Sequence, residues 1–278
     1  MALISAKKGI VDVILYLIVF IVVQIIVTYT GIFGWGLYHG EALRNMLLHF
    51  SMDNCYGLIA ITSAFSSLIT IAVFLSRKWT PVTKDYLQSK PWLTLFWIVL
   101  FTLGAIIPLE FIYEYVGLEM DDNTAKVFAG LLKEPWGYVA VGVLAPLAEE
   151  IVFRGAILRS LLGMMSKKNH WAAIMISAAI FGVVHGNVAQ FVNALVIGLL
   201  LGWMFYRTKS IVPGILLHWV NNTVAYVLAN LVPRTDGKLI DLFGGNEKTV
   251  YYAVGFSLCI LIPSFLQLVC RLRKAKTV

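Results

Sequence analysis

Two adjacent glutamates and an arginine interrupt an apolar stretch of this chain: Glu149, Glu150 and Arg154 lie between Trp136 and Met165. An ionised side chain at the centre of a bilayer costs roughly 2.5–3.5 kcal/mol, so these groups need partners or water if the stretch spans a membrane. Residues four apart share one face of an α-helix, and Glu150 can therefore pair with Arg154. Glu149 is turned about 100° away from that pair. We expect Glu149 to activate water, and Glu150 and Arg154 to orient the site. Arg154 could instead bind a carboxylate of the substrate, and the sequence does not choose between these two roles.

Polar side chains also occur inside two later apolar segments. His185 follows Phe181 by four residues, and Asn222 follows His218 by four residues, so each pair shares a helix face. The same relation to His218 favours Asn222 over its neighbour Asn221. With a rise of about 1.5 Å per residue, all of these groups fall near the middle of the membrane, as Glu149 does. The pattern predicts one internal site to which three helices contribute.

The composition defines the elements that must position these residues. The chain is 59% hydrophobic and 13% charged, with a mean hydropathy of +0.82, which excludes a soluble globular protein. We predict an all-α, polytopic integral membrane protein, with one domain over residues 1–278 and a polar cavity inside the membrane. About eight segments have the length of a transmembrane helix: 11–33, 55–75, 91–109, 136–163, 171–187, 188–206, 211–232 and 250–269.

The basic residues outside these segments predict the orientation in the cell membrane. Six lie on one side of the expected spans: Arg44, Lys126, Lys133, Arg234, Lys238 and Lys248. Fifteen lie on the other side, including both ends of the chain, which the positive-inside rule makes cytoplasmic. The net charge of +7 therefore indicates topology and contact with the lipid bilayer. No basic and aromatic module accompanies it, so nucleic acid is not an expected partner.

The loops give two further expectations. Asn123 or Thr124 can cap a short amphipathic helix that runs through Leu132 on the outer surface and ends before Pro135. The stretch 233–249 contains three glycines and is predicted to be a loop.

The motifs together resemble a known signature. Glu149-Glu150-x-x-x-Arg154, Phe181-x-x-x-His185 and His218-x-x-x-Asn222 follow one another in the order found in the CPBP family, the CAAX-protease and bacteriocin-processing (Abi) intramembrane proteases. Each motif falls on an expected helix, and the family-like catalytic core covers about residues 136–226. The resemblance implies an eight-span helical fold and a glutamate-dependent endopeptidase. Its partners would be prenylated proteins or small membrane-associated peptides, and roles in peptide processing or bacteriocin immunity are both open.

Peptide hydrolysis needs an activated water, a stabilised oxyanion and a protonated leaving amine. No Ser or Cys stands beside a base at a nucleophile position, so we favour direct attack by water with Glu149 as the general base. His185 would position that water, while His218 and Asn222 would stabilise the oxyanion. No cofactor is required in this mechanism.

Three alternatives use the same side chains. Glu149, His185 and His218 could form a zinc site with two histidines and one carboxylate. The groups could instead form the proton relay of a transporter. They could also belong to a membrane scaffold or immunity protein without catalytic activity.

Overall fold

The computed structural model describes residues 5–40, 55–231 and 238–272, and these residues form helices without a strand. Each segment predicted to span the membrane is mostly helical, and the chain is an all-α polytopic membrane protein. By length and composition, five single helices can cross a membrane: α1 (Ala6–Tyr38), α3 (Tyr56–Ser76), α5 (Trp92–Tyr115), α10 (Val188–Thr208) and α13 (Glu247–Arg271). That the other three segments also cross stays a prediction.

Contacts divide the chain into two compact units. Unit 1 comprises Met1–Pro81 and Asp121–Ser166, and unit 2 comprises Val82–Met120 and Lys167–Val278. The expectation of a single domain over residues 1–278 stays a prediction. Five of the basic residues that predict the orientation lie outside the described residues: Arg44, Arg234, Arg273, Lys274 and Lys276.

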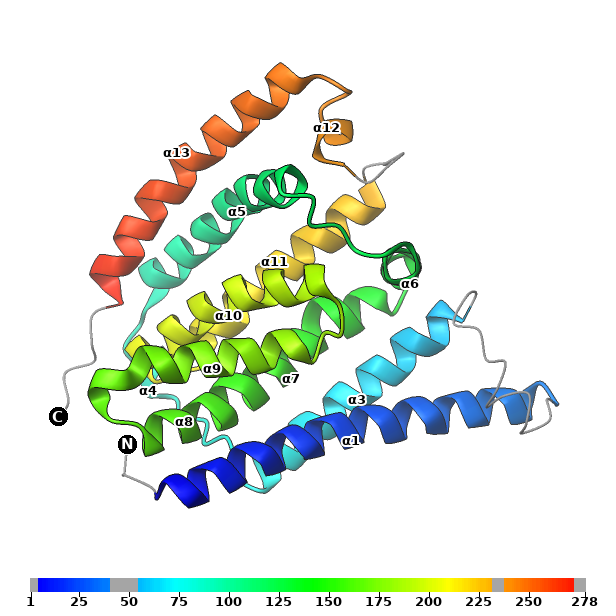
Figure 1. The fold of residues 1–278 in the computed structure, drawn as a ribbon, viewed down its shortest axis with the longest axis vertical. Coiled ribbons are helices and arrows are strands. Elements are labelled where there is room, and N and C mark those ends of the chain that lie inside the picture. The colour runs from blue at the N-terminus through cyan, green and yellow to red at the C-terminus, as the bar shows by residue number, and fades with distance from the viewer. Residues whose placement is uncertain (1–4, 41–54, 232–237, 273–278) are drawn as a thin grey trace. The chain divides into compact units, whose positions relative to one another are not determined.

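In unit 1, α1 and α3 pack against each other, and both also contact the helical segment that contains the two glutamates (Figure 1). Aromatic rings join these elements. The ring of Phe20 on α1 meets that of Phe153 edge to face, with centroids 5.4 Å apart. Tyr16, Phe74 and Trp79 form a second aromatic cluster, in which neighbouring centroids lie 5.0 to 5.8 Å apart. This cluster fixes the chain where it leaves the end of α3.

The segment expected as one regular span over 136–163 is helical but not regular. It consists of a π-helix η1 (Tyr138–Leu144), α7 (Ala145–Glu149), a second π-helix η2 (Glu150–Leu158) and α8 (Arg159–Met164). Pro146 gives a physical reason for the first irregularity, because it has no N–H to donate to the carbonyl four residues earlier. The two glutamates thus lie where an α-helical turn passes into π-helical turns.

The amphipathic helix predicted on the outer surface is present as α6, Asp122–Lys133. Its cap is Asp121, not Asn123 or Thr124 as predicted. The Asp121 carboxylate accepts hydrogen bonds from the backbone N–H of Thr124 at 3.0 Å and from its hydroxyl at 2.6 Å. Leu131 is buried near the end of the helix.

These hydrogen bonds predict a measurable titration. Because the Thr124 hydroxyl and N–H stabilise the charged form, the pKa of Asp121 lies below its ordinary value of 3.8. The cap is therefore complete above that ordinary value and is lost as the pH falls through the lowered pKa. In a carboxyl-carbon NMR titration, we expect Thr124→Ala to move the midpoint of Asp121 upward. An unchanged midpoint would contradict the role of the hydroxyl.

In unit 2, α13 packs along α5, and α11 packs on α5 and α10 (Figure 1). The bounds of the remaining helices are α4 Asp85–Gln88, η3 Lys167–Asn169, α9 His170–Val183, α11 Val212–Leu231 and α12 Leu239–Leu242. The stretch 233–249, predicted to be a loop, therefore includes the short helix α12 and the start of α13. Side chains from α5, α10, α11 and α13 form the buried core: Ile98, Phe101, Ile197, Leu201, Met204, Leu217 and Leu268, joined by Leu272 just beyond α13.

The contact between α5 and α13 depends on a glycine. A Cβ at Gly104 would lie 2.8 Å from the backbone nitrogen of Leu261 and 3.0 Å from its Cα, too close to be accommodated without moving a helix. We expect Gly104→Ala to lower the melting temperature in detergent, because overpacking costs about 1–3 kcal/mol. Gly255→Ala is the matched control, since nothing lies within 4 Å of the added carbon on the same α13. Equal melting temperatures for the two variants would contradict this packing argument.

Candidate active site

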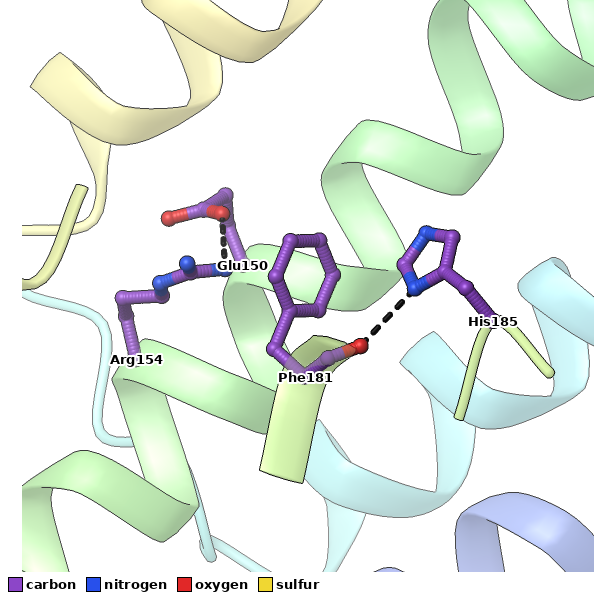
Figure 2. Close-up of polar contacts among 4 residues, drawn as sticks. All are labelled: Glu150, Arg154, Phe181 and His185. Atoms are coloured by element: carbon purple, nitrogen blue, oxygen red, sulfur yellow. Dashed lines mark hydrogen bonds and ion pairs between the residues drawn. The ribbon is translucent and has the colours of Figure 1, made fainter. Parts of the chain in front are cut away.

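The carboxylate part of the candidate site lies in unit 1. Arg154 Nη1 donates to Glu150 Oε1 at 2.7 Å, which confirms the predicted ion pair one helical turn apart (Figure 2). The two side chains are 1% and 0% exposed. Glu149 is the last residue of α7, and Glu150 is the first residue of η2. Because a buried charge needs a partner, Arg154 fixes Glu150 as a structural carboxylate.

Removing one member of this pair should be more harmful than replacing both. Arg154→Met leaves the Glu150 carboxylate buried without its cation, which costs about 3–5 kcal/mol in comparable pairs. We therefore expect Arg154→Met to lower the melting temperature strongly, and the double variant with Glu150→Gln to recover much of that loss.

Arg271→Met is the control, because Arg271 is an exposed arginine at the end of α13 and surface substitutions change stability by about 0.5 kcal/mol or less. A double variant less stable than Arg154→Met alone would contradict the pairing argument.

The histidine part lies in unit 2, where the structure corrects one prediction. His185 was expected on a helix, but α9 ends at Val183 and His185 lies in the turn that follows. Gly186 has a φ of +79°, in the left-handed region that glycine favours, and Asn187 then caps α10 by accepting from the N–H of Gln190 at 2.8 Å. These two residues end one helix and begin the next within a short turn.

The position of His185 in this turn determines its chemistry. Its Nδ1 lies 2.8 Å from the carbonyl oxygen of Phe181 (Figure 2). Because a carbonyl oxygen can only accept, Nδ1 must carry the proton of this hydrogen bond. A neutral His185 ring therefore presents Nε2 with a free lone pair, which can accept a proton from water or bind a metal ion.

Phe181 brings His185 and His218 together within unit 2. Its ring centroid lies 4.9 Å from that of His185 and 6.0 Å from that of His218, and both contacts are close to perpendicular. His218 comes from α11 and is 7% exposed. Asn222 lies one turn further along α11, and its Oδ1 accepts from Asn221 Nδ2 at 3.3 Å. His185, in the turn after α9, and His218, on α11, therefore both contact the ring of Phe181.

Sequence reasoning missed the packing of Thr80 against Ile151 and Gly155 of the glutamate-containing segment within unit 1. Thr80, in the chain after α3, donates its hydroxyl to the carbonyl of Ile151 at 2.6 Å. Gly155 faces the same side chain: a Cβ there would lie 2.2 Å from Thr80 Cγ2. A glycine directly after Arg154 was a visible signal of a close approach, but nothing in the sequence names Thr80 as the neighbour.

Comparison with known proteins identifies the region that contains these residues. Residues 131–224 match the family model described as type II CAAX prenyl endopeptidase Rce1-like. We refer to residues 131–224, which are similar to this family, as the Rce1-like region. It agrees with the expected core of 136–226, and it includes every predicted site residue from Glu149 to Asn222. The resemblance to the CPBP family is thereby confirmed.

A curated relative extends the similarity beyond the Rce1-like region. The protein "Putative membrane peptidase YdiL" of Bacillus subtilis (strain 168) is 24% identical over 167 residues. The alignment covers 58% of this chain and 65% of that protein, which is just under two thirds of its length. No solved structure matches the chain significantly.

Proposed function

We propose that this chain is a membrane-embedded endopeptidase that hydrolyses prenylated or small membrane-associated peptides with water activated by a glutamate. One observation carries the proposal: the Rce1-like region, 131–224, holds a buried Glu150–Arg154 pair directly beside a second glutamate, and two histidines on one phenylalanine. On the charge distribution, we also propose that both termini are cytoplasmic.

In the proposed mechanism, Glu149 is the general base. Its carboxylate takes a proton from water as the oxygen attacks the scissile carbonyl, and it then returns that proton to the leaving amine. Glu149 is assigned this role because Glu150 is held by Arg154 at 2.7 Å. Glu150 and Arg154 act as orienting residues, which keep the local helix and the direction of the neighbouring carboxylate fixed.

The unit 2 residues are proposed to complete the reaction. His185, with Nδ1 donating to Phe181, offers Nε2 as the acceptor that positions the attacking water. His218 and the amide of Asn222 supply hydrogen-bond donors for the oxyanion of the tetrahedral intermediate. In well-studied hydrolases, removing one donor of this kind lowers kcat by about 10²–10³-fold.

A zinc-dependent peptidase is the main rival, because the lone pair on His185 Nε2 suits a metal as well as a water. We propose the mechanism without a resident cofactor, and chelation separates the two possibilities.

The first test is peptide cleavage by purified full-length protein in detergent or liposomes, with a fluorogenic prenylated peptide and a library of unprenylated short peptides as substrates. We expect wild type to cleave, and Glu149→Gln and His218→Ala each to lose at least about 10²-fold in kcat, because base and oxyanion donor act in the transition state. Glu247→Gln is the matched control: it removes a carboxylate at the exposed start of α13, outside the Rce1-like region, and should leave the rate unchanged.

The other outcomes select among the alternatives. Loss of activity with a chelator, restored by zinc alone, would transfer the assignment to a metalloprotease. Full activity of Glu149→Gln would rule out the glutamate as the base. If folded wild type cleaves neither prenylated nor unprenylated peptides, the peptidase proposal fails for these substrate classes. The result would then favour a transporter or a non-catalytic scaffold.

A further inference from the structure

We propose that Thr80, which lies outside the Rce1-like region, is a positioning residue for the two glutamates. Its side chain holds the π-helical turns of η2 in register and thereby fixes the directions of the two carboxylates. The catalytic part of this inference rests on the proposed function, whereas its structural part does not. All the contacts that carry it lie within unit 1.

A π-helix of nine residues needs a local cause. Such turns are rare in proteins, occur mostly as single turns and are frequent at functional sites. Wider turns change the angle at which each side chain leaves the helix axis. Glu149 ends α7 and Glu150 begins η2, so any slip between π and α register turns these carboxylates relative to the rest of the helix. A contact that fixes the register of η2 therefore also fixes the directions of the two carboxylates.

Thr80 makes such a contact with η2. It is 2% exposed, and its hydroxyl donates to the carbonyl of Ile151, the residue directly after Glu150, at 2.6 Å. A carbonyl oxygen has two lone pairs, so Ile151 can accept this bond in addition to a bond within its helix. One turn later, Gly155 gives room for the Thr80 side chain, because a Cβ there would lie 2.2 Å from Cγ2 and 2.7 Å from Oγ1.

The chain around Thr80 is itself fixed on both sides. Before it, the ring of Trp79 packs on Tyr16 and Phe74 at 5.0 and 5.1 Å between centroids. After it, Arg159 from α8 donates through Nη2 to the carbonyl of Pro81 at 3.4 Å, and through Nε to that of Gly155 at 2.9 Å. Two carbonyls on one side of η2, four residues apart, thus receive side-chain donors. Thr80 joins an anchored loop to the start of the π turns.

The test compares three variants of the full-length protein. Thr80→Val keeps the shape but removes the hydroxyl, and Thr80→Ser keeps the hydroxyl. Thr70→Val is the matched control, because Thr70 is also fully buried in unit 1 but its hydroxyl has no hydrogen-bond partner among the described residues.

Two measurements are made on each variant: amide hydrogen exchange over residues 150–158, and kcat and KM for the peptide that wild type cleaves.

We expect Thr80→Val to exchange faster over 150–158, while Thr80→Ser and Thr70→Val remain like wild type. We expect Thr80→Val to lower kcat by about 10²-fold with little change in KM, since a misplaced catalytic group affects the transition state more than substrate binding. Rescue by Thr80→Ser separates the hydroxyl from general packing at this site.

The two measurements test separate parts of the inference. Unchanged exchange in Thr80→Val would overturn the register role, whatever the activity. Faster exchange with unchanged kcat would overturn the link from register to catalysis. If wild type does not cleave, or Glu149→Gln is fully active, the proposed function fails, and the exchange comparison still decides whether Thr80 holds η2.

Discussion

The burial of an ion pair inside an apolar helix is the constraint on which the helical segment around the two glutamates depends. Glu150 and Arg154 are almost completely removed from solvent, and all nine residues of η2 are buried with them. The free energy of removing two charges from water is recovered only when the partner geometry is good and other polar groups are satisfied. The helix that holds the pair must therefore be packed closely and held in one conformation. A hydrophobic pair would impose no such requirement.

The same segment departs from regular helical geometry, and the departures have identifiable partners. Pro146 lies between the two π-helices, and Thr80 and Arg159 donate to the Ile151 and Gly155 carbonyls on one side of η2. A native chain that breaks a local rule usually compensates for it nearby, and such breaks concentrate at functional sites. Here the irregular turns coincide with the two glutamates, and the compensation comes from a loop and a side chain of the same unit.

Spacing along the sequence predicted the helices and the ion pair because these features depend on residues that are close in sequence. Apolar length predicted the helical segments, of which five can cross a membrane as single helices, and the separation of four residues predicted the Glu150–Arg154 pair. The register of η2 could not be predicted, because it depends on Thr80, which is seventy-one positions from Ile151 in the sequence. The boundary between two spans was predicted at residue 187, and α10 does begin at Val188, but α9 ends at Val183 because Gly186 and Asn187 form a turn before that boundary. For α6, several adjacent residues could all serve as a cap, so propensity alone could not select Asp121.

The histidine part shows how backbone geometry can select a chemical role before any substrate binds. A water that attacks a carbonyl must donate a proton, so its environment needs acceptors, whereas the developing oxyanion needs donors. The turn after α9 makes Phe181 the acceptor for His185 Nδ1, which leaves an acceptor at Nε2 of the neutral ring. Asn222 offers an amide that can donate without any change of protonation state. The hydrogen bond to Phe181 therefore leaves Nε2 of the neutral ring as an acceptor, as the proposed water-positioning role of His185 requires.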